Sequence, residues 1–222
     1  MIESRRRLRP WLNAACAAML ALGPAAGALL ALAPSPAAAQ NGARDAQAEQ
    51  FVQTEAQRAL TILANHELST AEKTRIFRAF VDEVADVPRI TQFVLGKYAR
   101  IATPAQRQSF ATVFREYASN VYESRLDEYH GETLKVTGSV VRRPGDVIVN
   151  SVVVGGRQSK PVAVAWRVMG GGAGWKVIDV QVAGVWLAIT EQQDFVSTMD
   201  NAGGNVDVLI RQLQQKVQTE RK

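Results

Sequence analysis

The sequence predicts an α+β domain in which a four-stranded, antiparallel, curved sheet packs against several helices. Helical periodicity dominates residues 51–129, four runs rich in Val, Ile and Trp follow at the spacing of hairpins, and helical periodicity returns after residue 187. Helices followed by a strand meander and then by further helices are typical of this class. No repeat and no Pro/Ser-rich linker divides this stretch, so we expect one domain.

Residues 1–39 have the organisation of an export signal. A basic start at residues 5–9 precedes a long stretch dominated by Ala and Leu, and Ala37-Ala38-Ala39 offers a small-residue cleavage site before Gln40. We therefore expect residues 1–39 to be a cleaved signal peptide and residues 40–222 to be a single domain outside the cytoplasm. The run of arginines also fits a twin-arginine signal, so the export route stays open.

The positive charge of the chain comes mainly from this leader. Among 222 residues there are 26 Lys+Arg and 21 Asp+Glu, and without the four arginines and one acid of residues 1–39 the net charge falls from +5 to +2. So small a charge argues against a nucleic-acid partner. The single cysteine, Cys16, also lies in the leader, so the remaining chain has no thiol for catalysis, metal binding or disulfides.

The helices are recognised by their end signals. Ser69 with Glu72 three residues later forms a capping box, and Thr103-Pro104 combines a cap with a proline in the first turn. Gly96 is the expected end of the short third helix. The predicted helices cover residues 51–66, 69–84, 88–96 and 103–129, a segment after residue 187, and a last amphipathic segment from 206 to 217.

The strands are separated by turn signals. Their predicted ranges are residues 133–141, 146–154, 161–169 and 175–186. The glycine run at residues 170–174 resembles a phosphate-binding loop, but no Gly-Lys-Ser/Thr follows and a strand comes next, so it predicts a hairpin. Gly184, inside the last predicted strand, permits a bend or bulge.

Side chains with catalytic potential are few and scattered. His66 and His130 lie far apart, each at a predicted helix end, and no cluster has metal-ligand spacing. Asp179 interrupts an apolar strand, so its carboxylate needs hydrogen-bond partners if it is buried, and a structural role is favoured. We expect no catalytic residue, no metal and no cofactor, and therefore a protein that is not an enzyme.

Several short motifs follow one another in a fixed order between Phe80 and Val217. They are Leu95-Gly96-Lys97-Tyr98, residues 102–107, Tyr129-His130-Gly131, residues 175–180 and Gly184-Val185-Trp186-Leu187. This order resembles the MlaC family, also called toluene-tolerance auxiliary proteins. The resemblance implies an NTF2-like cone with an internal apolar cavity and a periplasmic phospholipid carrier. It also implies two partners, an outer-membrane lipoprotein complex and the substrate-binding component of an inner-membrane ABC transporter.

The chain departs from the family pattern at three positions. Trp186 stands where the family usually has Ser, and Glu191 and Gln192 stand where it usually has a Tyr-Arg pair, which puts any lipid or partner contact of that Arg in doubt. Residues 201–204 are similar to the hopanoid-associated branch. A hopanoid or another polycyclic lipid therefore remains an alternative ligand.

A lipid carrier needs apolar lining on both layers and a polar mouth. The candidate lining residues are Phe77, Phe80, Phe93, Tyr98, Phe110, Phe114, Tyr117 and Tyr122 on the helices and Val149, Val153, Val164, Trp166, Val177 and Val185 on the strands. Arg78, Lys97 and Arg100 are candidates for the mouth, where they would attract an anionic head group. Packing of the lining residues as an ordinary core explains the same pattern, and sequence does not separate the two.

Two other functions stay open at this point. An enzyme on a similar cone-shaped scaffold would need titratable groups inside the cavity, and Asp179 is its only obvious candidate. A structural adaptor would have a filled core and a large exposed apolar patch.

Overall fold

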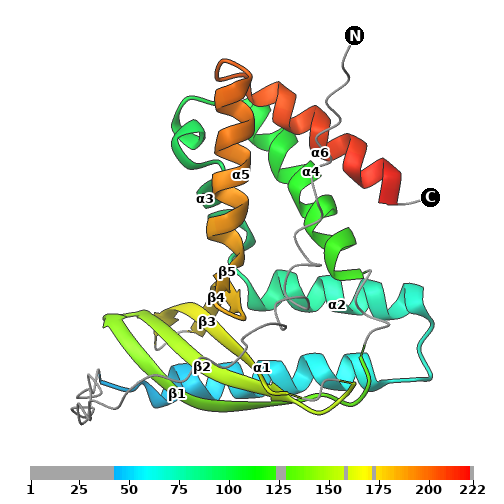
Figure 1. Ribbon diagram of the computed structural model, residues 1–222, viewed down its shortest axis with the longest axis vertical. Helices are drawn as coiled ribbons and strands as arrows, with labels where there is room; N and C mark the ends of the chain where they lie inside the picture. Colours follow the sequence, from blue (N-terminus) through cyan, green and yellow to red (C-terminus); the bar gives the residue numbers. More distant parts are fainter. Residues whose placement is uncertain (1–42, 124–128, 158–159, 172–173, 221–222) are drawn as a thin grey trace, which may run out of the picture. The chain divides into compact units, whose positions relative to one another are not determined.

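The computed structural model describes residues 43–123, 129–157, 160–171 and 174–220, which belong to one compact unit, residues 41–222. Its elements are shown in Figure 1: helices α1 (Ala46–Ala64), α2 (Thr70–Val84), α3 (Val87–Val94), the short 3-10 helix η2 (Gly96–Arg100) and α4 (Pro104–Glu123); strands β1 (Thr133–Arg143), β2 (Asp146–Val154), β3 (Val162–Gly171), β4 (Gly174–Val182) and β5 (Val185–Trp186); and helices α5 (Leu187–Asn201) and α6 (Val206–Glu220). The predicted α+β class is confirmed.

The helix starts follow the predicted end signals. The Ser69 hydroxyl accepts from Glu72 N at 3.3 Å and the Glu72 carboxylate accepts from Ser69 N at 3.0 Å, which confirms the capping box of α2. Thr103 and Gln106 exchange an equivalent pair of bonds at the start of α4. Helix α4 is described as far as Glu123, residues 124–128 lie outside the described ranges, and Tyr129 is not helical.

The strand count differs from the prediction, because the last predicted strand is divided in two. Strand β4 ends at Val182 and the chain reverses through Ala183 and Gly184, with φ of 49° and 87°. Two consecutive residues with positive φ match the twist of a tight hairpin, so Val182 pairs with Val185 in β5. The sheet therefore has five antiparallel strands in the order β1-β2-β3-β4-β5.

One face of this sheet carries an apolar row across its central strands. Val149, Trp166 and Val180 are direct cross-strand partners on β2, β3 and β4, so their side chains share a face. Register shifts in β1 after Val136 and in the β3–β4 pair after Arg167 interrupt the ladder. Such bulges increase the local twist, which accounts for the curved sheet of Figure 1.

A buried ion pair braces the opposite face. Asp146, only 1% exposed, receives two hydrogen bonds from the guanidinium of Arg167, at 3.0 and 2.9 Å. Arg142 and Arg143 approach the same carboxylate at 3.4 and 3.3 Å. The hydrogen bonds from Arg167 are the main reason why the pKa of Asp146 lies below its ordinary value.

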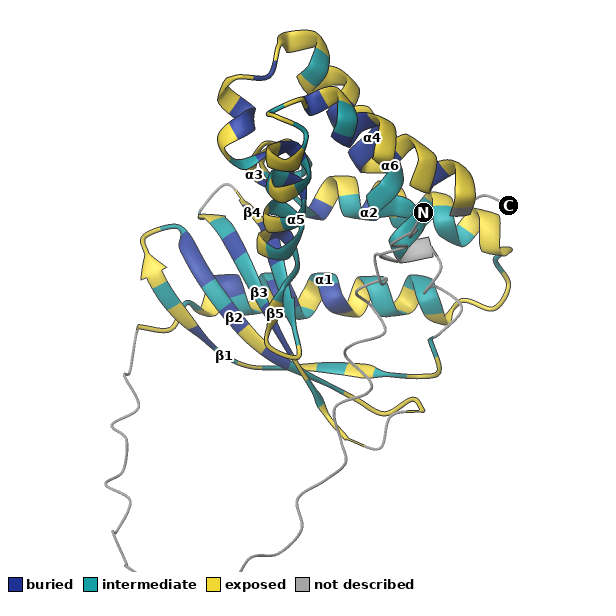
Figure 2. Cartoon of the chain, turned by 45° about the horizontal axis from the view of Figure 1, so that its top comes forward, coloured by how far each residue is buried: buried dark blue, intermediate teal, exposed yellow. Residues whose placement is uncertain are grey.

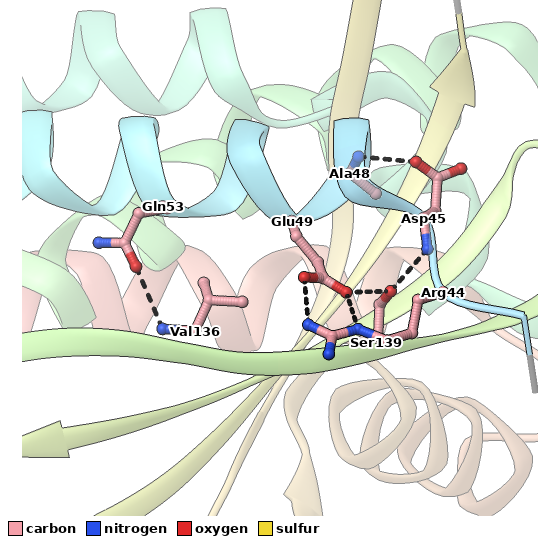
Figure 3. A network of polar contacts seen from close by, with 7 residues as sticks. All are labelled: Arg44, Asp45, Ala48, Glu49, Gln53, Val136 and Ser139. Carbon is pink, nitrogen blue, oxygen red and sulfur yellow. Dashed lines mark hydrogen bonds and ion pairs between the residues drawn. The ribbon is translucent and has the colours of Figure 1, made fainter. Parts of the chain in front are cut away.

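Helix α1 is fastened to β1 by the polar network of Figure 3. The Glu49 carboxylate accepts from the Ser139 hydroxyl at 2.7 Å and from Arg44 at 2.9 and 2.6 Å. One turn further, Gln53 accepts from Val136 N at 3.1 Å. Its amide nitrogen also donates to Leu134 O. These bonds satisfy backbone groups of the edge strand next to its bulge.

The apolar residues form two buried clusters. Figure 2 marks the buried residues of the helices and strands in dark blue. The helical cluster joins α3, η2, α4, α5 and α6. The helix–sheet cluster joins α1 and α2 to strands β2, β3 and β4. Helices α3 and α5 also contact β4, so the two clusters are connected at that strand. In the described part of the chain, no helix has both the length and the apolarity needed to span a membrane.

Candidate functional site

The structure distributes the fourteen candidate lining residues over both clusters and the surface. Seven of them are buried: Phe80, Tyr98, Phe110, Phe114, Val149, Val164 and Val177. Four are half-buried: Phe77, Tyr117, Val153 and Trp166. Phe93 and Val185 are exposed, at 38% and 49%, and the side chain of Tyr122 lies outside the described residues.

The buried aromatic side chains of the helical cluster pack against one another. Phe110 stacks on Phe114 with ring centroids 5.6 Å apart, and Phe195 of α5 meets both rings edge-on at 5.9 and 6.0 Å. Phe110 is 0% exposed. In this conformation the three rings pack against one another inside the helical cluster.

The helix–sheet cluster has an open side. Val147, Val149 and Val168 are 0% exposed, whereas further along the same face Val136, Trp166 and Val180 are only half-buried. On the facing helices, the half-buried side chains that pack on this cluster are Phe51, Ala59, Ile62, Phe77 and Val81. We call this set of half-buried apolar residues the open margin. Together these residues present partly exposed apolar surface beside the buried core.

Trp166 is held in place within the open margin. Its indole N–H donates to the Ser151 hydroxyl at 2.9 Å, and that hydroxyl donates to Val164 O at 2.9 Å. Ser151 and Val164 are both buried. The one polar atom of the indole is therefore satisfied inside the sheet, which leaves the apolar part of the ring available at the margin.

Two of the three predicted mouth cations lie together. Lys97 and Arg100 line a pocket of about 630 Å³ with the exposed Phe93, between α3, η2 and α5. Lys97 forms an ion pair of 2.7 Å with Asp200, which also accepts from the Tyr98 hydroxyl, and these bonds lower the pKa of Asp200. Arg100 forms no ion pair with any described residue. Arg78 lies on α2, away from this pocket.

A second pocket, of about 440 Å³, lies between α1 and α2. Arg58 lines it and donates hydrogen bonds of 2.8 and 2.6 Å to Glu83, and its guanidinium carbon lies 5.3 Å from the centre of the Phe80 ring. The predicted lining residue Phe80 thus contacts a surface arginine on one side and the core on the other. Arg58, one of the two arginines that line this pocket, is therefore already paired with a carboxylate.

Asp179 is buried and has the hydrogen-bond partners that the sequence required. Its Oδ1 accepts from Val180 N and from Ala188 N, both at 2.8 Å. Ala188 lies in the first turn of α5, so a strand carboxylate caps a helix eight residues further on. Burial raises the pKa of Asp179, while these backbone bonds oppose the rise. The geometry is that of a structural joint between β4 and α5.

Sequence reasoning did not identify a set of neighbouring polar side chains that α4, α5 and α6 contribute. Glu191 lies on the core face of α5, between the buried Ala188 and Phe195, and receives the Tyr117 hydroxyl at 3.3 Å. Lys216 lies with its Nζ 5.2 Å from the centre of the Tyr117 ring. A signal was present, because Glu191 occupies an apolar position in the helical spacing of α5.

Among the residues described, no group of three or more His, Cys, Asp or Glu side chains is placed to hold a metal ion. His66 and His130 are both exposed. The site that the structure offers is therefore an apolar one with a few polar side chains at its edge.

Fold and site together define a helix-and-sheet binding domain with an open apolar margin. Residues 53–215 match the sequence profile of the MlaC protein family, and the chain belongs to this family. A solved structure of a phospholipid-binding protein from Ralstonia solanacearum, in complex with a phospholipid, is similar to the chain with a TM-score of 0.69 at 28% sequence identity. The match covers 79% of this chain and 99% of the other.

Proposed function

We propose that this protein carries a phospholipid, whose acyl chains lie against the open margin of the helix–sheet cluster. The main observation behind this proposal is a change in side-chain exposure along one sheet face. Its valines at one end are 0% exposed, whereas Trp166 and Val180 further along are half-buried. Membership of the MlaC family and the phospholipid in the similar Ralstonia structure support this choice of ligand.

The physical need for such a carrier is set by hydrocarbon hydration. Exposing a methylene group to water costs about 0.8 kcal/mol, so two ordinary acyl chains cost on the order of 20 kcal/mol. A carrier offsets this cost only if protein replaces water along most of the chain length. The open margin supplies apolar contacts from α1, α2 and three strands, while the helical cluster keeps its own rings packed.

Exchange of the lipid requires the open margin to widen without unfolding. The helical cluster is connected to the sheet through β4, where Asp179 caps α5 and Asp86 N donates to Val177 O at 2.9 Å. A small rotation about this connection changes the space beside the margin and leaves both clusters intact. A partner that binds more tightly to the widened state would shift the protein toward that state when it docks. The lipid would then be exchanged with that partner.

The proposed setting is the periplasm, reached through the signal at residues 1–39. There the carrier would move phospholipid between an outer-membrane lipoprotein complex and the substrate-binding component of an inner-membrane ABC transporter. The chemistry is non-covalent throughout, so the protein needs neither a catalytic residue nor a cofactor.

Native mass spectrometry of the protein purified from cells tests the proposal. We expect a co-purifying lipid, and transfer of labelled phospholipid between donor and acceptor vesicles by the delipidated protein. Val180→Asp places a charge on the margin and should abolish both. Val140→Asp is the matched control, because Val140 is 43% exposed and lies outside both clusters.

The outcomes separate the proposal from its rivals. Lipid binding and transfer that survive in Val180→Asp, with a melting temperature close to that of wild type, would refute the open margin as the site. A protein that neither retains lipid nor transfers it would refute the carrier function itself. A hopanoid as the co-purifying species would keep the site and change the ligand.

A further inference from the structure

Four titratable side chains gather where α4, α5 and α6 meet. Glu191 and Asp194 are three residues apart on α5, which places them on neighbouring turns of one helix surface. The Tyr117 hydroxyl of α4 donates to Glu191 at 3.3 Å, and the Lys216 ammonium of α6 lies 5.2 Å from the centre of the Tyr117 ring. We call these four residues the polar quartet.

The quartet is only partly satisfied by its own members. Glu191 and Asp194 are half-buried, and burial raises the pKa of both carboxyl groups. Lys216 interacts electrostatically with both, yet within the described ranges it lies within 4 Å of neither carboxylate. A carboxylate has about four acceptor sites, and the single long bond from Tyr117 leaves most of those on Glu191 unused. The half-buried carboxylate of Glu191 therefore keeps acceptor sites that a ligand donor can use, and the exposed ammonium of Lys216 lies near the same tyrosine ring.

The position of the quartet relates it to the open margin. Glu191 lies one turn into α5, the helix whose first turn is capped by Asp179 of β4. It therefore belongs to the end of the helical cluster that is nearest the sheet. Tyr117, a half-buried aromatic residue on the edge of that cluster, belongs both to the quartet and to the candidate lining residues. A lipid that lies against the open margin with its polar end toward the start of α5 would reach this junction.

Resting on the proposed function, we propose that the polar quartet binds the head group of a zwitterionic, primary-amine phospholipid of the phosphoethanolamine type. The two carboxylates accept hydrogen bonds from the ammonium group, and Lys216 contacts the phosphate. With all groups ionised, the two carboxylates and one ammonium of the quartet sum to −1, which disfavours a purely anionic head group. The quartet thereby selects the lipid class, whereas the open margin binds the tails.

Competitive loading tests this selection. Delipidated protein is incubated with vesicles of phosphatidylethanolamine and phosphatidylglycerol in equal amounts, and the bound lipids are counted by native mass spectrometry. We expect phosphatidylethanolamine to exceed phosphatidylglycerol by about tenfold, the effect of one charge-assisted hydrogen bond. Glu191→Gln should bring the ratio close to one by lowering the loading of phosphatidylethanolamine. Lys216→Gln should lower the loading of both lipids.

Glu67→Gln is the matched control, because Glu67 is exposed in the turn between α1 and α2. Asp194→Asn supplies a second test if Glu191→Gln does not fold. Normal loading with an unselective wild-type ratio, or a wild-type ratio in both α5 variants, would refute the quartet while leaving the carrier function standing. A ratio that changes instead in Arg100→Gln would place the head group in the basic pocket and refute the quartet as well. Absence of any bound lipid would refute carrier and quartet together.

Discussion

The two apolar clusters of this protein are built from similar residues but differ in closure. In the helical cluster the aromatic rings pack against one another, and Val94, Phe110 and Met199 are 0% exposed. The helix–sheet cluster is equally tight at Val147 and Val168 but ends in the half-buried Trp166 and Val180. Part of the apolar surface of this cluster therefore stays exposed after folding. The difference indicates a division of labour, in which one cluster supplies rigidity and the other supplies surface.

The largest expected effect is a loss of stability when a buried ring of the helical cluster is removed. Phe110→Ala removes a ring that is 0% exposed and contacts Phe114 and Phe195, so we expect a loss of about 3–5 kcal/mol in the free energy of unfolding. Trp166→Ala removes a half-buried ring and should cost less stability but more lipid binding. Denaturant unfolding and vesicle loading measure the two quantities. The comparison fails if Phe110→Ala is the milder of the two for stability.

Ligand protection should be confined to the open cluster. With lipid at 100 times its dissociation constant, the native state gains about 2.7 kcal/mol. Hydrogen exchange should slow in β3, β4 and α2 around Trp166, Val180 and Phe77, and change little in the Phe110 turn of α4. The measurement is exchange mass spectrometry with and without bound phospholipid. Equal protection in both clusters would show that the lipid acts on the whole domain.

The ion pair on the opposite sheet face should make stability depend on pH. The pKa of Asp146 is lowered by Arg167, so its folded value lies below the unfolded one and the unfolded chain binds more protons. The contribution is present above the ordinary value of 3.8 and disappears as the pH falls below it. Asp146→Asn should cost about 2 kcal/mol at pH 7 and flatten the acid limb of the stability curve. If the free energy of unfolding of Asp146→Asn falls as steeply at acid pH as that of the wild type, this role of Asp146 is wrong.

A smaller effect is expected at the start of α2. Ser69→Ala removes the cap of this helix and should cost about 1 kcal/mol. Because α2 carries Phe77 and Val81, fraying should also weaken lipid loading slightly. Thr103→Ala, at the equivalent cap of α4, is the matched variant and should affect stability alone. Thermal unfolding and loading of both variants test whether the two helices serve different clusters.

The sequence predicted the helices and strands better than it predicted which apolar faces are filled and which stay partly exposed. Ser69 with Glu72 and Thr103-Pro104 placed two helix starts correctly, because these signals act within four residues. The division of the last strand was missed. Gly184 alone suggested a bend, whereas the hairpin also needs a positive φ at Ala183, a residue type that rarely adopts one.

The candidate site shows the limit of pattern reasoning more clearly. Periodicity identified Phe110 and Trp166 as inward-facing but could not distinguish a filled interior from a margin, because that depends on which helix packs against which face. Glu191 was noticed only as a departure from the family pattern. Its contact with Tyr117, 74 residues away in sequence, requires the fold to be known.

The cap on α5 has a consequence for how the chain assembles. The N-terminal backbone of that helix receives no side-chain hydrogen bond from its neighbour Trp186 and accepts its cap from Asp179 in β4. The helix start is therefore completed only once β4 and the hairpin after it have taken their register. We expect the meander to form before the final two helices, so that the rigid half of the molecule is finished last and closes onto a sheet that already exists.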